Sequence, residues 1–186
     1  MIKILKLSIV IIYYRFKFAI LLNYKLKQIK IKRTILGLDV EKNTETVKKL
    51  NILLSNFQVY YQSLRGLHWN IKGKSFFELH VKFEEYYTDS QEKIDLIAER
   101  ILTLQGVPLH TFSDYTSRAV VPIGKDITQD VEAVKLISNT LSKLLELERE
   151  VLMLSDDGND EGTNSMMSDF ITEQEKTIWM LKSWLS

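Results

Sequence analysis

Five side chains of the types that bind metal ions lie between residues 68 and 99 of this 186-residue chain. They are two imidazoles and three carboxylates: His68, His80, Glu84, Asp95 and Glu99. If residues 75–104 form one helix, the last four share a face about 100° wide, because successive helical residues are about 100° apart. Together they predict a site with nitrogen and oxygen ligands for a metal ion.

A single helix cannot bring both ends of this face to one ion. Asp95 follows His80 by 15 residues, which is roughly 22 Å along a helix, whereas a metal ion lies only about 2 Å from its ligand atoms. Two chains can combine the donors if their helices pair antiparallel about a two-fold axis, so that His80 of one chain faces Asp95 of the other. The spacing therefore predicts two identical metal sites in a dimer interface.

Ordinary structural roles compete with this interpretation. A histidine at the end of a helix can be a cap, and His80 and Glu84 could form a surface pair four residues apart. Asp95 and Glu99 could be solvated, or Glu99 could pair with Lys93 or Arg100. One observation counts against these alternatives. Apolar residues flank Asp95 and His80, and an unpaired carboxylate is costly to bury among them.

The positions of the histidines favour the shared site over a site within one chain. Helical bundles that hold two iron ions inside one chain carry a Glu-x-x-His motif on two of their helices. None of the three histidines in this sequence follows a glutamate by three residues. A site between two chains is therefore the better prediction.

The composition limits the class of protein and the kind of metal. The length suits one domain with its own core, and two prolines and seven glycines indicate a mostly helical chain. The absence of cysteine excludes disulfides, thiolate ligands and cysteine nucleophiles. Carboxylate and imidazole ligands suit iron, manganese or zinc, and a carboxylate-rich site favours iron.

Apolar periodicity and helix-ending residues predict an all-α fold. Ser75 and Glu78 match a capping box that would start the second long helix, and Gly106 and Pro108 follow its end. The predicted helices span residues 40–69, 75–104, 112–118, 127–154 and 163–185, with a long connection at 106–126 and an acidic loop at 155–162. Four long helices and a long second connection, which contains the short helix, indicate a four-helix bundle that this connection crosses.

The first 33 residues differ in composition from the rest. They contain nine lysines and arginines and no acidic residue, which leaves residues 34–186 with a net charge of −8. No uncharged stretch there is long enough to span a bilayer, and no clear secretory signal is present. Three interpretations remain open: translated upstream sequence that the mature protein lacks, a basic arm that binds nucleic acid or a membrane, or a targeting segment. AT-rich codons can encode its commonest residues, which favours the first.

Three motifs resemble the Dps family, the mini-ferritins of starved or oxidatively stressed bacteria. They are Leu67-His-Trp-Asn-Ile-Lys-Gly73, Phe76-Phe-Glu-Leu-His80 and Asp95-Leu-Ile-Ala-Glu-Arg100. The spacing of their metal-binding residues matches the ferroxidase signature of that family, and the segment at 175–181 is similar to its last helix. The resemblance covers about residues 35–186 and predicts a ferritin-like Dps domain there, with a basic extension at 1–34.

The resemblance implies a ferroxidase, an enzyme that oxidises and stores iron. Two iron ions would be bound at each shared site by ligands from both chains: His68, His80 and Glu84 from one, and Asp95 and Glu99 from its two-fold mate. Hydrogen peroxide would oxidise Fe(II) to Fe(III) there. The product would mineralise inside a cytoplasmic, dodecameric shell, which protects DNA from oxidative damage. Trp69 would lie beside the site, where it either packs or donates electrons to harmful oxidants.

Carboxylates near the start of the last helix line pores on three-fold axes in this family. Asp156 and Glu161 fall at corresponding positions, and Asp160 is a further candidate. Ser165 stands where the family has another acidic residue, which departs from the pattern. A three-fold ring of carboxylates would concentrate Fe(II) by its electric field. The same residues could instead form a solvated acidic turn.

DNA binding is the second function that the resemblance raises. Family members that bind DNA usually do so through flexible lysine-rich tails, and we expect no such tail after the last helix. Because the negative body would repel phosphate, only residues 1–33 could bind DNA. The alternative function is therefore a structural protein that compacts the nucleoid through this arm. We expect instead that the native protein starts near Ile31, lacks most of the arm, does not bind DNA at physiological salt and does not associate with membranes.

Overall fold

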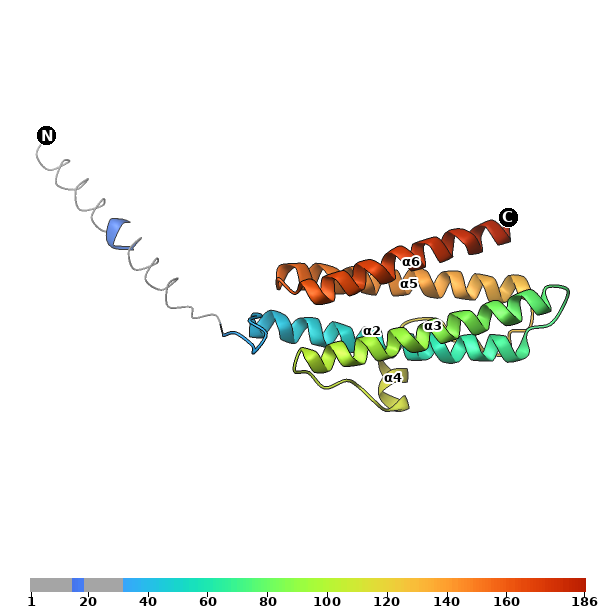
Figure 1. Ribbon diagram of the computed structural model, residues 1–186, viewed down its shortest axis with the longest axis horizontal. Helices are drawn as coiled ribbons and strands as arrows, with labels where there is room; N and C mark the ends of the chain where they lie inside the picture. The colour runs from blue at the N-terminus through green and yellow to red at the C-terminus, as the bar shows by residue number, and fades with distance from the viewer. Residues whose placement is uncertain (1–14, 19–31) are drawn as a thin grey trace, which may run out of the picture. The chain divides into compact units, whose positions relative to one another are not determined.

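The computed structural model describes residues 15–18 and 32–186 (Figure 1). The chain forms two compact units, residues 1–33 and residues 34–186. The second unit contains the helices α2 (Val40–Asn70), α3 (Phe76–Thr103), α4 (Phe112–Arg118), α5 (Asp130–Asp157) and α6 (Glu161–Leu185). The all-α bundle with a short helix in its long connection is confirmed. Most of the basic extension, residues 1–14 and 19–31, lies outside the described residues, so the predictions for it remain predictions.

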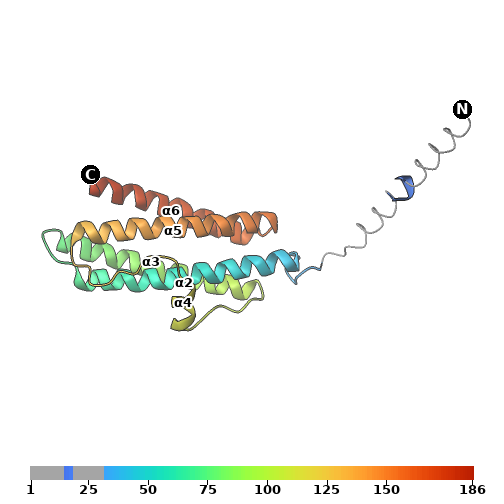
Figure 2. The same cartoon turned by 180° about the vertical axis from the view of Figure 1, so that it is seen from behind.

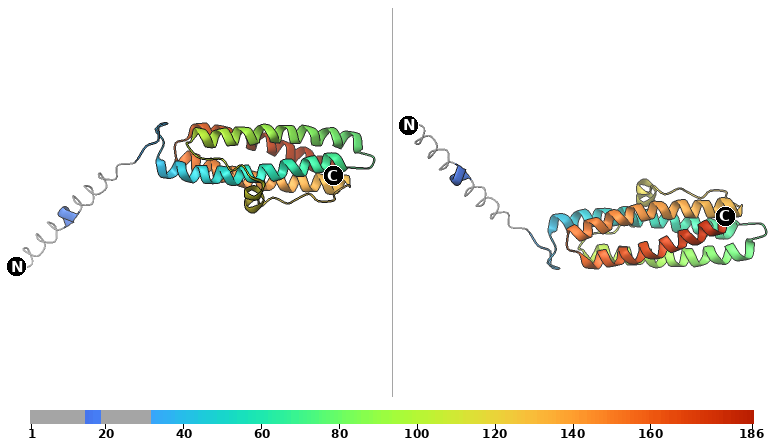
Figure 3. Two further views of the ribbon diagram at one scale, coloured as in Figure 1. Left: turned by 90° about the horizontal axis from the view of Figure 1, so that it is seen from below. Right: turned by 90° about the horizontal axis from the view of Figure 1, so that it is seen from above.

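The four long helices pack as two pairs, α2 with α3 and α5 with α6, and α2 also packs on α5 (Figures 1 and 3). A short connection joins the two helices of each pair, which therefore run antiparallel. The long connection between the pairs runs back along α2, and α4 packs on α2 within it (Figure 2). As a result, the α2–α3 turn and the C-terminal end of α6 lie at the same end of the bundle (Figure 1).

Apolar residues at helical spacing form a closed core between the long helices. The following have no exposed surface: Leu50, Leu53, Leu64, Phe83, Ile97, Ile101, Ala133, Val134, Leu144, Val151 and Met167. Truncating one buried leucine to alanine typically costs about 2–5 kcal/mol, so this core holds the helices, and the polar residues on them, in fixed positions. No helix in the described part of the chain is long and apolar enough to cross a membrane.

Two asparagines of α2 hold the long connection against the bundle. Asn56 is fully buried, and its Oδ1 accepts the backbone N–H groups of Val120 at 2.8 Å and Val121 at 3.0 Å. Asn51 accepts the backbone N–H of Leu109 at 2.7 Å. Because buried backbone groups need partners, these side chains fix the path by which the chain returns to the start of α5.

The start of α3 differs from the prediction. Ser75 directly precedes the helix, but its side chain makes no capping hydrogen bond. Instead its Oγ donates to Asp130 Oδ2 at 3.3 Å. The predicted capping box is therefore wrong, because a tertiary contact with the first residue of α5 uses the serine hydroxyl.

The acidic loop is shorter than predicted. The helix α5 continues to Asp157, and only residues 158–160 separate it from α6. Residues 155–157 contain nothing that ends a helix, whereas Asn159 adopts a left-handed conformation with a φ of 55°. Two of the predicted pore residues therefore belong to helix ends: Asp156 to the last turn of α5, and Glu161 to the first turn of α6.

Candidate metal centre

His68 and His80 lie together where the end of α2 meets the start of α3. Their rings are stacked, with centroids 3.8 Å apart and planes inclined by 18°. His68 Nδ1–H donates to the backbone carbonyl of His80 at 2.7 Å, and His80 Nδ1–H donates to the carbonyl of His68 at 2.9 Å. Two reciprocal hydrogen bonds therefore lock the imidazoles against each other.

These hydrogen bonds determine which ring nitrogen is available. A carbonyl oxygen only accepts hydrogen bonds, so the Nδ1 atom of each ring carries a proton, and the Nε2 atom of the neutral imidazole keeps a free lone pair. Histidines that bind metals are held in this way through their second ring nitrogen. The histidine pair thus has the tautomer and orientation that a metal ligand requires.

The α2–α3 turn itself is well fixed. Ile71 is 2% exposed and anchors the turn in the core. The backbone N–H of Lys72 donates to the carbonyl of Thr128 at 3.0 Å, which ties the turn to the segment before α5. The ring of Phe76 stacks on His80, with centroids 5.0 Å apart. The imidazoles are therefore positioned by the fold before any ligand binds.

Glu84 lies one turn after His80, and Tyr87 holds its side chain. The Tyr87 hydroxyl donates to Glu84 Oε1 at 3.1 Å, and the ring of Tyr87 meets His68 edge-on with centroids 5.4 Å apart. Partial burial, followed by the hydrogen bond to Glu84, raises the pKa of Tyr87, so the phenol remains a donor at neutral pH. Tyr87 was not predicted as a site residue, although its position seven residues after His80 places it on the same helix face.

The other two carboxylates of this face lie toward the far end of α3. Because α3 is continuous from Phe76 to Thr103, Asp95 stands roughly 22 Å from His80 along the axis. Asp95 and Glu99 are both exposed, so the burial expected from their apolar neighbours is wrong for the single chain. Among residues 32–186, neither carboxylate has a hydrogen-bond or ion-pair partner, and no three His, Asp or Glu side chains come close enough to hold a metal ion.

The two cations that could have paired with Glu99 are engaged elsewhere. Arg100 forms an ion pair with Asp160, at the start of α6. Lys93 forms an ion pair with Glu173, on α6, at 2.8 Å. The prediction that Glu99 pairs with Lys93 or Arg100 is therefore wrong, and its carboxylate remains available to bind a metal ion.

The bundle and its histidine pair can be set beside known proteins. The family model of the ferritin-like domain matches residues 47–186. The "DNA protection during starvation protein" of Porphyromonas gingivalis is 39% identical over 150 residues, which cover 81% of this chain and 94% of that protein. This chain belongs to the Dps family. A crystal structure of the DPS protein from Vibrio cholerae O1, described as a member of a broad superfamily of ferritin-like diiron-carboxylate proteins, has a TM-score of 0.81 and 47% identity, and covers 83% of this chain and 97% of that one.

Trp69 of this Dps chain lies next to the histidine pair and faces outward. Its side chain is 57% exposed. The guanidinium of Arg65 lies over the rings of Trp69 and Tyr61, at 4.8 Å and 5.5 Å from their centroids. Within one Dps chain the indole is therefore accessible at the end of α2 and is not part of the core.

The three acidic residues predicted to line a pore fall into two groups in this Dps chain. Asp156 and Glu161 are exposed at the ends of α5 and α6. Asp160 is 5% exposed and forms an ion pair with Arg100, and it also accepts hydrogen bonds from the backbone N–H of Thr163 at 3.1 Å and from its hydroxyl. Asp160 therefore caps α6, and this structural role replaces the pore role predicted for it.

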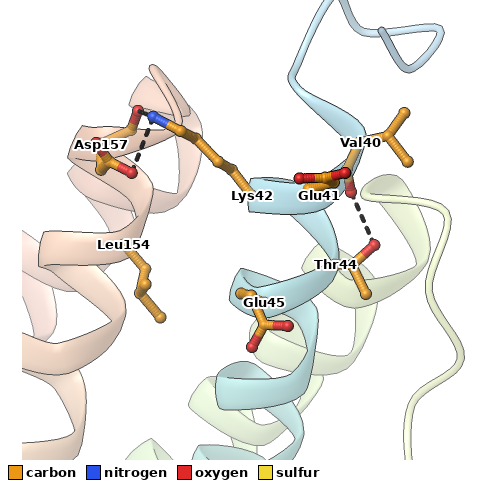
Figure 4. A pocket seen from close by; sticks show the side chains of 7 residues that line it. All are labelled: Val40, Glu41, Lys42, Thr44, Glu45, Leu154 and Asp157. Atoms are coloured by element: carbon orange, nitrogen blue, oxygen red, sulfur yellow. Dashed lines mark hydrogen bonds and ion pairs between the residues drawn. The ribbon is translucent and has the colours of Figure 1, made fainter. Parts of the chain in front are cut away.

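A surface hollow of about 480 Å³ lies near the start of α2, at the opposite end of this helix from His68 (Figure 4). Its polar side chains are partly paired with one another: Lys42 forms an ion pair with Asp157 at 2.9 Å, and the Thr44 hydroxyl donates to the Val40 carbonyl at 2.8 Å. It contains no histidine. The hollow therefore lacks the donors that the histidine pair offers, and we do not assign it to iron.

Proposed function

We propose that this Dps chain is a ferroxidase, which oxidises Fe(II) and stores the resulting Fe(III). Iron is the substrate of this reaction rather than a resident cofactor. The observation that carries the proposal is the reciprocal pair of hydrogen bonds that leaves the Nε2 atoms of His68 and His80 free. Two imidazoles prepared in this way, beside the carboxylate of Glu84, make one half of a metal site with nitrogen and oxygen ligands.

A second copy of the chain supplies the other half through Asp95 and Glu99. Exposed apolar residues on the same face of α3 support this assignment: Phe77 is 83% exposed, Val81 53% and Leu102 58%. All three lie within the same arc of about 100° as the carboxylates. Exposed apolar surface of this kind marks a contact region. Two antiparallel α3 helices about a two-fold axis would cover it and complete two sites at once.

The ligand set suits the oxidation of iron. Carboxylates are hard anionic ligands, which stabilise Fe(III) relative to Fe(II) and so favour the loss of an electron. Two iron ions at each shared site would supply the two electrons that hydrogen peroxide needs to become water. Because both electrons come from iron ions that are held together, no one-electron oxygen radical is released.

The remaining features of the proposal concern the assembly. We propose a dodecameric shell in the cytoplasm, in which the Fe(III) mineralises and DNA is protected from oxidants. The name of the Porphyromonas gingivalis relative and the diiron-carboxylate description of the Vibrio cholerae structure support this function. Asp156 and Glu161 would line the pores through which Fe(II) enters, and Trp69 would donate electrons to stray oxidants near the shared site.

Mixed dimers test the division of the site between two chains. In a dimer of one His80→Ala chain and one Asp95→Ala chain, one site carries both lesions and the other site carries neither. We therefore expect each mixed dimer to have about half of the unaltered ferroxidase activity, and an equimolar random mixture about a quarter, although each variant alone is inactive. The measurement is the initial rate of Fe(II) oxidation by peroxide after the two chains are unfolded and refolded together.

A second mixture provides the control. Chains with His80→Ala and chains with Glu84→Ala carry lesions in the same half of the site, so every site in their mixed dimers is damaged and no activity should return. Recovery in both mixtures, or in neither despite verified mixed dimers, would contradict a site shared between chains.

DNA binding through residues 1–33 is a second candidate function, because nine positive charges gather in that segment. Such binding would be strong at low salt and would weaken steeply as salt rises. We expect the native protein not to retard DNA at physiological salt. Retardation that disappears when residues 1–33 are deleted would favour the nucleoid-compacting function instead.

A further inference from the structure

A second group of polar side chains lies between α3, α5 and α6 and is named the interior cluster. It consists of Asp89 and Lys93 on α3, Glu148 on α5, and Glu173 and Gln174 on α6. Lys93, Glu148 and Gln174 are buried, with exposures of 4%, 0% and 3%, whereas Glu173 faces solvent at the rim. Charged side chains are almost never buried to this degree unless they are paired or bind an ion.

Lys93 supplies the positive charge of the interior cluster. Its ammonium donates to Asp89 and, at 2.8 Å, to Glu173 Oε2. It also lies 5.2 Å from the centroid of the Phe170 ring, in the range of a cation–π contact. The ammonium is thus held between two carboxylates and an aromatic face, which offset the cost of its burial.

Other oxygen atoms of the interior cluster have no partner. Gln174 Nε2 donates to Glu148 Oε1, but neither Glu148 Oε2 nor Gln174 Oε1 accepts a hydrogen bond within the described part of the chain. Lys93 nevertheless affects the ionisation of Glu148. Burial raises the pKa of this carboxyl to about 7, and the hydrogen bond from Gln174 and the charge of Lys93 oppose that rise. A buried oxygen without a hydrogen-bond partner is costly to the fold, because water no longer solvates it.

A cavity of about 250 Å³ adjoins these groups. Asp89, Lys93, Glu173 and Gln174 line it, together with apolar and aromatic side chains that include Tyr60. A water molecule occupies about 30 Å³ in the liquid, so the cavity has room for several waters or for a partly hydrated ion. The cavity therefore lies beside both the unpaired oxygens and the carboxylates of the interior cluster.

We propose that the interior cluster is a divalent-cation site that Lys93 occupies with its own ammonium, so that iron is excluded from the interior of each chain. The donor set is carboxylate and amide oxygen, which suits Mn(II), Mg(II) or Fe(II). Asp89 and Glu173 hold the ammonium between them, and Lys93 also opposes the rise that burial causes in the pKa of the nearby Glu148 carboxyl. Removing the ammonium would leave the carboxylates of Asp89 and Glu173 at the cavity without a cation between them, and a divalent cation would relieve their repulsion by binding both.

This inference does not depend on the proposed ferroxidase function. It concerns a second place in the chain, where the ammonium of Lys93 pairs with both carboxylates and takes the position that a metal ion would need. It also gives a physical reason why iron chemistry would take place at the histidine pair and not within the bundle.

Binding of Mn(II) to variants of Lys93 tests the inference. All proteins carry His80→Ala, which damages the shared sites and keeps them out of the measurement. We expect Lys93→Ala and Lys93→Ser each to bind one additional Mn(II) per chain, measured by the loss of the free Mn(II) signal in electron paramagnetic resonance. Adding Asp89→Asn should weaken this new binding by about tenfold or more, since it removes an anionic ligand that lines the cavity.

Lys143→Ala is the matched control. Lys143 is exposed and pairs with Glu146 at 2.8 Å, so this change removes the same charge without opening the interior, and it should add no Mn(II). Additional Mn(II) in this control, or interior binding by the chain that retains Lys93, would overturn the proposal. Folded Lys93 variants that gain no Mn(II) would overturn it as well.

A folding defect would also be informative. If Lys93→Ala and Lys93→Ser do not fold alone, millimolar Mn(II) should restore the folded helical state, because the ion takes the place of the lost ammonium. Restoration by Mn(II) would support the proposal. Failure of both variants to recover their circular dichroism in Mn(II) would count against it.

Discussion

The histidine pair and the interior cluster use similar groups in opposite ways. At the α2–α3 turn, one nitrogen of each imidazole is hydrogen-bonded to the protein's own backbone, which leaves the other nitrogen with a free lone pair. In the interior cluster, the ammonium of Lys93 lies between two carboxylates and neutralises the charge that would attract a metal ion. The comparison teaches that donor atoms alone do not make a metal site. A metal site also requires that the chain provide no cation of its own.

The largest effect should follow from removing one of the two imidazoles. We expect His80→Ala to slow Fe(II) oxidation by about 100-fold or more, because changes that only disturb the support of a metal ligand already cost about 10–100-fold. His110 is an exposed histidine outside the pair, and His110→Ala should leave the rate within about twofold. Similar losses in the two variants would mean that the reciprocal hydrogen bonds do not mark the site.

The second prediction compares a buried carboxylate, Asp160, with an exposed one, Asp156. Asp160→Ala removes the cap of α6 and leaves Arg100 without its partner, so we expect a loss of about 3 kcal/mol in the free energy of unfolding. Asp156→Ala should change this free energy by less than about 0.5 kcal/mol, because the residue is exposed. Chemical denaturation measures both, and equal effects would contradict the structural role given to Asp160.

The third effect is a pH dependence that originates in the interior cluster. Burial raises the pKa of Glu148 from 4.5 to about 7. The folded chain therefore binds more protons than the unfolded chain between these values, and stability must fall as the pH rises through this window. The corresponding loss is at most about 3 kcal/mol. Lys93 and Arg149 lessen the shift, and Glu173 adds to it.

Glu148→Gln tests this dependence because glutamine does not titrate. We expect the variant to gain stability relative to the unaltered chain as the pH rises from about 5 to 8, measured from thermal midpoints at each pH. A constant difference between the two proteins over this range would show that Glu148 is not buried in the manner described.

The smallest effect should concern the supply of iron to the shared sites. Asp156→Asn together with Glu161→Gln removes two exposed carboxylates near the α5–α6 connection. We expect iron uptake to slow by about threefold at low ionic strength and to converge with the unaltered protein at high salt, where charges are screened. Unchanged uptake at low ionic strength would remove these residues from the entry path.

Much of the fold could be predicted because it depends on local patterns. Apolar spacing gave the long helices to within a few residues, and the short helix Phe112–Arg118 was predicted with its observed bounds. The errors occurred where tertiary contacts override local signals. Ser75 has the sequence of a capping residue but bonds to Asp130 across the bundle, and the acidic residues before Gly158 extend α5 although they resemble a loop.

The residues of the candidate site also differ in how far local sequence determines their positions. The pairing of His68 with His80 depends on a turn of a few residues, and the structure places these two rings in contact. The contribution of Asp95 and Glu99 depends on another copy of the chain, so the assignment remains a prediction. The interior cluster was not predicted at all, because Lys93 and Glu148 are charged residues whose burial depends on how three helices pack together.

Because α3 is unbroken, this helix fixes the spacing of the two metal sites in the proposed dimer. His80 and Glu84 of one half and Asp95 and Glu99 of the other lie on it, so the number of residues between them sets both the distance between the two iron sites and the angle at which these ligands face. One inserted residue would turn Asp95 by about 100° and move it by about 1.5 Å, and both sites would be lost together. An insertion of seven residues, about two turns, would restore the angle to within about 20° and would move the two sites about 10 Å further apart, with each half still opposite its partner. We therefore expect substitutions in the middle of α3 to be tolerated far better than the insertion of a single residue.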